Sequence, residues 1–204
     1  TTKTTKTKTT TTTELLKQLM KLEDDEAIYT LGIRWLRGTE GQKQNLGKAM
    51  GCYQKLIAKY KNQESILTTL AASFLYKKGK NPFNSISYHI LNECVKRGSI
   101  EAMYTLGVMY REGIYVKKNE QTAMDYFKQA AVEGNHAAAY NNIGLLYAKE
   151  ETTEREAYTY IKKAASLKEP KGCFNLGMLL ETGHGCQRNL QKALSCFQES
   201  YHGG

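Results

Sequence analysis

The sequence predicts an all-α protein in which pairs of helices repeat along the chain. Only 2 of the 204 residues are proline, so long helices are left unbroken. Apolar residues make up 41% and charged residues 24%, which is the composition of an ordinary globular chain. Two short sequence patterns alternate, each recurring five times at intervals of 33 to 39 residues. Two alternating patterns with one period predict a repeating unit of two helices.

Before the repeats, we predict a tail and one short helix. Residues 1–13 consist of Thr and Lys and contain no apolar side chain, so we expect them to be disordered. Thr11 and Glu14 have the spacing of a capping box, and leucines follow at helical intervals. These residues predict a helix over residues 14–25 that covers the N-terminal end of the repeats.

Each repeat places small and large residues at fixed positions. The first pattern has a small residue in the middle of a predicted helix, although glycine there costs about 1 kcal/mol relative to alanine. That cost is tolerable where two helix backbones approach closely, so we expect the small residues to face the large residues of the second pattern. The small residues of the first pattern are Gly32, Ala71, Gly107, Gly144 and Gly177, and those of the second are Ala49, Ser87, Ala123, Ala157 and Ala193.

The predicted repeats extend over about residues 26–62, 63–98, 99–134, 135–168 and 169–204. In most repeats glycines lie between the two helices, where turns with positive φ favour them. The fourth repeat has no such glycine, and its two small residues are only 13 positions apart. Its loop is therefore predicted to be shorter than the others.

The third repeat resembles a known family. It reads AMYTLGVMYREGIYVKKNEQTAMDYFKQAAVEGN from Ala102 to Asn135, which is similar to the Sel1-like repeat, a relative of the tetratricopeptide repeat. The matching residues are Leu106, Gly107, Tyr110, Gly113, Val116, Ala123, Tyr126, Phe127, Ala130 and Ala131. The resemblance implies a right-handed α-solenoid of five helix-turn-helix repeats over residues 26–204. It also implies a role in scaffolding protein complexes.

The sequence contains no recognisable catalytic signature. It lacks GxSxG, HExxH, the phosphate-binding GxxxxGK[ST] and the glycine triplet of dinucleotide-binding folds. Cys173, His184, Cys186 and Cys196 are residue types that bind zinc, but they lack the close Cys and His pairs of zinc sites. We therefore expect no enzyme activity, no catalytic residues, no metal and no cofactor.

The cysteines predict a reducing environment. Their number, five, is odd, and no two form a Cys-x-x-Cys pair, so we expect free thiols in a reducing, cytoplasmic compartment. The family resemblance leaves one alternative, because some bacterial members pair cysteines between helices. The apolar runs are far shorter than the ~20 residues that a membrane-spanning helix needs, so no span is predicted.

The net charge of +9 raises a second possible function. A nucleic-acid-binding protein concentrates its Lys and Arg residues on one surface. Much of the charge here alternates with acidic residues, as at Arg155 between Glu154 and Glu156, which favours an ordinary solvated surface. A basic ridge across the first two repeats keeps the nucleic-acid alternative open. Its residues are Lys55, Lys59, Lys61, Lys77, Lys78 and Lys80.

The predicted function is that of a non-enzymatic adaptor that binds a protein or peptide partner. The first helices are expected to line a concave groove. In the resembling families the groove-facing positions lie three residues before and four or five residues after the small residue. In this sequence they are Tyr29, Arg37, Tyr76, Tyr104, Arg111, Asn141 and Lys149. Aromatic and Arg side chains are common anchors of interfaces. A weak ligand-binding or hydrolase-like activity, attributed to some bacterial members, is a further alternative.

The C-terminal repeat is predicted to make a further contact. Terminal repeats of a solenoid normally carry a polar cap, because each repeat buries its apolar face only against a neighbour. No predicted helix follows to cover Leu179, Leu194 and Phe197. We expect this end to dock onto another subunit or copy, or the natural chain to continue beyond residue 204.

Overall fold

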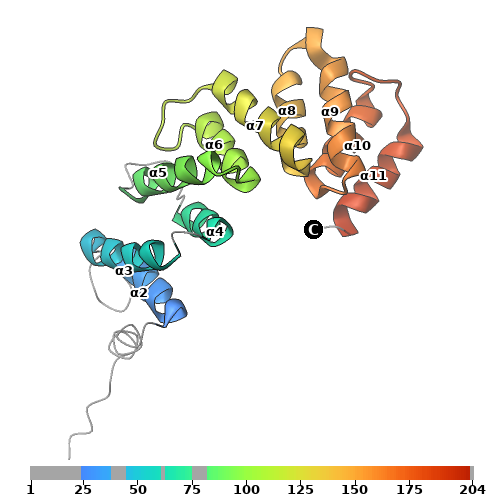
Figure 1. Ribbon diagram of the computed structural model, residues 1–204. Coiled ribbons are helices and arrows are strands. Elements are labelled where there is room, and N and C mark those ends of the chain that lie inside the picture. Colours follow the sequence, from blue (N-terminus) through green and yellow to red (C-terminus); the bar gives the residue numbers. More distant parts are fainter. Residues whose placement is uncertain (1–23, 38–44, 61–62, 75–81, 203–204) are drawn as a thin grey trace, which may run out of the picture. The chain divides into compact units, whose positions relative to one another are not determined.

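The computed structural model describes residues 24–37, 45–60, 63–74 and 82–202. These residues form ten α-helices that follow one another in consecutive pairs (Figure 1). The pairs are α2 (Asp25–Arg37) with α3 (Leu46–Lys59), α4 (Glu64–Phe74) with α5 (Pro82–Lys96), α6 (Ile100–Glu112) with α7 (Glu120–Gly134), α8 (Ala137–Tyr147) with α9 (Glu154–Ser166), and α10 (Pro170–Thr182) with α11 (Leu190–His202). The predicted all-α class and the helix pairing are confirmed. The predicted tail and almost all of the predicted helix over residues 14–25 lie outside the described residues.

The chain divides into two compact units, residues 1–67 and 68–204. In the N-terminal unit, α2 packs against α3. The Tyr53 ring lies directly over Gly32, where a Cβ atom would come within 2.7 Å of the ring. Lys59 pairs with Asp25 at 2.8 Å and joins the end of α3 to the start of α2. This unit is therefore held by one interlocked hairpin.

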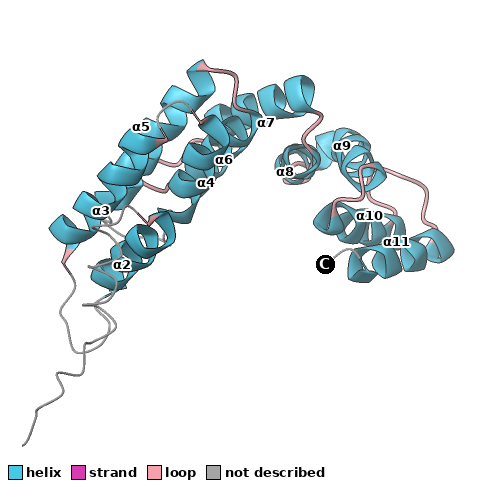
Figure 2. Cartoon of the chain, turned by 60° about the horizontal axis from the view of Figure 1, so that its bottom comes forward, coloured by secondary structure: helices cyan, strands magenta, loops and turns pink. Residues whose placement is uncertain are grey.

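The C-terminal unit contains three complete hairpins built in the same way (Figure 2). A Cβ atom on Gly107 would lie 2.6 Å from the Phe127 ring, and one on Gly177 would lie 2.6 Å from the Phe197 ring. Gly144 likewise faces Ile161. The predicted interlocking of small and large residues is confirmed in these three hairpins, because no side chain fits at the small position.

The loop between the helices of a hairpin closes through a recurring asparagine. Asn119 donates its backbone N–H to the carbonyl of Tyr110 at 2.9 Å, and its side chain caps α7 by accepting from Thr122 N at 3.0 Å. The same two bonds recur at Asn45 and at Asn189. Asparagine is a favoured N-cap residue because its side-chain oxygen satisfies one of the free N–H groups of the first turn.

The fourth repeat closes its loop differently. There the Thr153 hydroxyl donates to the carbonyl of Tyr147 at 2.6 Å. Helix α8 ends at Tyr147, three residues after Gly144, whereas α6 and α10 end five residues after their small residues. The shortening that the sequence assigns to the loop therefore falls mainly on the helix, since no glycine is present to extend it into a left-handed turn.

The second repeat has a more polar interior than the others. Ser87 stands where the other repeats have alanine, and its hydroxyl is fully buried without a hydrogen-bond partner among the described residues. The side-chain oxygen of Asn84, one turn earlier on α5, is in the same situation. A buried polar group without a partner costs stability because its bonds to water are lost.

We predict that Gly107→Leu lowers the stability of the chain by about 1–3 kcal/mol or more, because the new side chain must displace the Phe127 ring. Gly51→Leu is the matched control, since Gly51 lies within α3 and has no neighbouring atom within 4 Å of its missing Cβ. At Gly51 the better helix propensity of leucine should raise stability by up to about 1 kcal/mol. Urea unfolding followed by circular dichroism measures both. Equal effects at the two positions would contradict the proposed packing.

A second prediction concerns two serines that lie in different environments. Ser87→Ala should raise stability by about 1 kcal/mol, because it removes a buried hydroxyl without a partner. Ser99→Ala should lower it by about 1 kcal/mol. The Ser99 hydroxyl caps α6 by accepting from Ala102 N at 3.3 Å. Melting temperatures that shift in the same direction would show that the Ser87 hydroxyl is satisfied in solution.

Candidate functional site

A row of polar side chains links the first helices of the last three repeats. Asn142 on α8 accepts a hydrogen bond from Arg111 of α6, and its amide donates to the Tyr104 hydroxyl of α6 at 3.4 Å. Asn175 on α10 donates to the side-chain oxygen of Asn141 at 2.8 Å. We call Tyr104, Arg111, Asn141, Asn142 and Asn175 the polar row. It joins α6, α8 and α10 by side-chain bonds alone.

The polar row follows a regular register. The residue three before the small position of one repeat bonds to the residue two before the small position of the next repeat. Tyr104 thus meets Asn142, and Asn141 meets Asn175. Asn141 and Asn142 are only 4% and 5% exposed, so the bonds lie largely out of solvent. The row is a structural link between repeats as well as a potential contact surface.

Arg111 is the charged member of the row and retains unused hydrogen-bonding capacity. Its Nε donates to Glu112 at 2.8 Å, and one further nitrogen donates to Asn142. The side chain is 29% exposed. A guanidinium has five N–H donors in a planar fork, so donors remain for a carboxylate or carbonyl of a partner. Hydrogen bonding to Asn142 holds the group in one orientation.

His136 and Tyr104 connect the row to the start of α8. Their rings stack with centroids 4.5 Å apart. His136 caps α8, because its Nδ1 accepts from Ala139 N at 3.2 Å. Its Nε2 lies 3.1 Å from Glu101 of α6. The hydrogen bond from His136 lowers the pKa of Glu101 below its usual 4.5, and burial raises the pKa of Tyr104 above its usual 10.0.

The structure brings together three of the sequence-predicted site residues, Tyr104, Arg111 and Asn141. Lys149 does not join them, since it pairs with Glu120 at the start of α7. Tyr29 lies in the N-terminal unit, edge-on to Tyr53. Tyr76 and the side chain of Arg37 lie outside the described residues. The role of the seven residues in partner binding stays a prediction.

Sequence reasoning missed Asn142 and Asn175. Both lie next to a selected position, two residues before Gly144 and Gly177 respectively. The available signal was the run Asn141-Asn142 and the Asn at the equivalent place in the fifth repeat. A polar amide on an otherwise apolar helix is a reason to search for a partner on the neighbouring helix.

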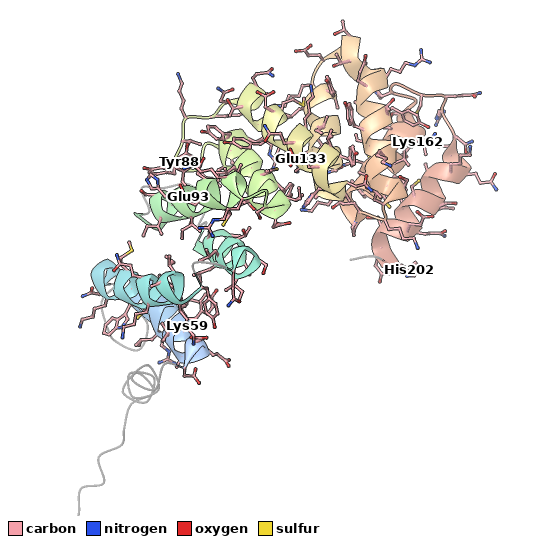
Figure 3. All side chains as sticks on the ribbon, viewed as in Figure 1. Lys59, Tyr88, Glu93, Glu133, Lys162 and His202 are labelled. Carbon is pink, nitrogen blue, oxygen red and sulfur yellow. The ribbon has the colours of Figure 1, made fainter. Side chains whose placement is uncertain are left out.

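The fifth repeat has two surface cavities. One, of about 420 Å³, lies between α9, α10 and α11 and is lined by residues that include Lys162, Lys192, Cys186 and Cys196. The other, of about 580 Å³, has His202 and Cys173 in its lining. Figure 3 labels Lys162 on α9 and His202 at the end of α11. Neither cavity shares a residue with the polar row.

All five cysteines are unpaired in the structure. Cys52, Cys94 and Cys173 are buried, whereas Cys186 and Cys196 are partly exposed. Within the described part of the chain, no three His, Cys, Asp or Glu side chains are grouped closely enough to hold a metal ion. Of the predicted basic ridge, Lys59 forms an ion pair with Asp25, and Lys61, Lys77, Lys78 and Lys80 lie outside the described residues.

The chain matches the Sel1 repeat family over residues 25–59, 100–135 and 170–204, just over half of its length. These segments correspond to the first, third and fifth hairpins. The chain belongs to the Sel1 repeat family. It is similar in fold to a Sel1 repeat protein from Oxalobacter formigenes, with a TM-score of 0.63, 24% identity and coverage of 94% of this chain and 79% of the other.

Curated relatives share shorter stretches. The chain is 40% identical to DAP3-binding cell death enhancer 1 of Rattus norvegicus over 82 residues, which is 39% of this chain and 16% of the relative. It is 27% identical to the ERAD-associated E3 ubiquitin-protein ligase component HRD3B of Arabidopsis thaliana over 111 residues, or 52% of this chain and 17% of the relative. The matched stretch thus spans about a sixth of each.

A third relative has an enzyme name. HcpC of Helicobacter pylori is 54% identical over 37 residues, 18% of this chain and 13% of the relative, and its name carries a provisional β-lactamase assignment. The relatives named above as a binding protein and as a ligase component belong to assemblies of proteins. Among the described residues, no helix has the length and apolar character needed to cross a lipid bilayer.

Acid should weaken the fold partly through Glu101. Its pKa is lower in the folded chain than the unfolded value of 4.5, so the folded chain binds fewer protons near that pH. The stability from the bond to His136 is therefore present above about pH 4.5 and is lost as the pH falls below it. Glu101→Gln should reduce the loss of stability between about pH 7 and pH 4. Urea midpoints at the two pH values measure this, with Glu133→Gln on α7 as control. An equal acid loss in wild type and Glu101→Gln would contradict the assignment.

Proposed function

We propose that this Sel1 repeat chain is a non-enzymatic adaptor that binds a protein or peptide through the polar row of α6, α8 and α10. The observation that carries the proposal is the fixed, partly exposed Arg111 in a row that runs across three successive repeats. Arginine and tyrosine are enriched among the residues that dominate interface energies.

Preorganisation supports the same proposal. Asn142 orients Arg111, and the stack with His136 fixes Tyr104, so neither side chain must lose its full rotamer freedom when a partner binds. Their donors suit peptide carbonyl groups and acidic side chains, which accept hydrogen bonds from a guanidinium in a bidentate manner. The partner surface is therefore proposed to be an extended or acidic protein segment.

The experiment compares two arginine variants. Arg111→Ala removes the proposed anchor, and Arg155→Ala removes an exposed arginine at the start of α9. Each chain is immobilised, and proteins that it retains from cells expressing it naturally are quantified by mass spectrometry. We expect at least one protein to be retained by wild type and Arg155→Ala, and reduced at least about tenfold with Arg111→Ala. Retention profiles that are the same for all three chains would overturn the proposal.

A further inference from the structure

The fifth repeat presents an apolar surface that faces away from the fourth repeat. Leu190, Leu194 and Tyr201 on α11 are 56%, 59% and 83% exposed. Phe174 and Met178 on α10 are also exposed, and the Phe174 ring touches the Phe197 ring with centroids 5.5 Å apart. The residues form one continuous patch over the two helices. We call Phe174, Met178, Leu190, Leu194, Phe197 and Tyr201 the end face.

In the preceding repeats, equivalent positions are covered by the next repeat. Ala131 and Ala165 stand eight residues after the small residues of α7 and α9, and they are only 2% and 8% exposed. Tyr201 stands at the same place on α11. Similarly, Tyr104 and Asn141 bond to the following repeat, whereas Phe174 at their position is half exposed. The end face thus occupies a position where this fold makes contacts.

A further hairpin packed as closely as α10 packs on α9 does not suit the end face. A Cβ atom on Gly172 of α10 would lie only 2.8 Å from the Cβ of Ala164 on α9. The residues of α11 that correspond to Ala164 and Ala165 are Ser200 and Tyr201. A tyrosine in place of alanine requires wider spacing, such as the roughly 8–10 Å of helices whose large side chains interdigitate.

The spacing of the end face on α11 matches a second copy of the same helix. Leu190, Leu194, Phe197 and Tyr201 follow at intervals of four, three and four residues, the seam of a two-helix contact. This spacing is symmetric about its midpoint. When two copies of α11 run antiparallel, Leu190 of each copy faces Tyr201 of the other, and Leu194 faces Phe197. Such a contact is the self-complementary interface of a two-fold dimer.

The charges around the seam also favour a second copy. The chain carries a net charge of +9, so two copies repel one another unless the contact itself is uncharged. The residues beside the seam on its solvent-facing side are Gln191 and Gln198, and the charged Lys192 and Glu199 lie on the opposite side of α11 by helical geometry. Antiparallel helices also align their dipoles favourably.

We propose that the end face is the interface of a symmetric homodimer in which α11 packs antiparallel against α11 of a second copy. The proposal goes beyond the adaptor function, because the end face and the polar row share no residue. A dimer would present two polar rows, so that a partner with two binding segments gains avidity.

The first test is the mass of the 204-residue chain in solution, measured by sedimentation velocity over a wide range of concentrations. We expect wild type to dimerise. Leu194→Glu should weaken the dimer at least about tenfold, since a buried carboxylate without a partner opposes association. Val132→Glu is the control, because Val132 on α7 is 81% exposed but lies outside the end face. A monomeric wild type, or equal effects of the two variants, would overturn the proposal.

The second test examines the antiparallel register. Leu190→Lys and Tyr201→Glu should each weaken self-association, but an equimolar mixture should dimerise. In the mixed dimer the introduced lysine of one chain faces the introduced glutamate of the other, and the second contact remains Leu190 with Tyr201. A mixture of Leu190→Lys with Leu194→Glu should not recover, since those positions do not face one another. Recovery in both mixtures, or in neither, would overturn the antiparallel pairing. All three substituted residues are more than half exposed, so the fold itself should be retained.

Discussion

The close approach of two helix backbones at a residue without a side chain is the constraint on which each complete hairpin depends. Gly107 leaves room for Phe127, and Gly177 leaves room for Phe197. The glycine sacrifices helix propensity, and the ring that fills the space returns it by burying apolar surface. Once this contact sets the spacing of a hairpin, the Asn N-cap and the loop bond can recur at the same places in repeats of different sequence.

The fold could be predicted because a repeat supplies several independent readings of the same pattern. Ser87 illustrates this: in isolation a serine predicts nothing, but its place in the column of Ala49, Ala123 and Ala157 locates α5. The shortening of the fourth repeat was also readable from spacing alone. Its location in α8 was not, because Thr153 replaces the asparagine bond with a hydroxyl bond that no spacing reveals.

The candidate site was only partly predictable. The first-helix register gave Tyr104, Arg111 and Asn141, but it described them as facing a groove. In the structure, Asn141 is buried and bonds to the next repeat, and Arg111 is held by Asn142. Contacts between consecutive repeats depend on how far each hairpin is rotated relative to the last. A single-repeat pattern contains no information about this rotation, so the partners of these side chains emerge only in three dimensions.

The register of the polar row has a consequence for modular rearrangement of the protein. Because the donor or acceptor lies at one position and its counterpart at a fixed position in the following repeat, any two repeats that carry the pair can adjoin. Excising the fourth repeat would place Tyr104 opposite Asn175, which is again a phenol hydroxyl opposite a carboxamide. Duplication of the fourth repeat would set Asn141 of one copy beside Asn142 of the next. A gene that gains or loses such a module therefore keeps its cross-links, and the length of the array can drift while its chemistry is conserved.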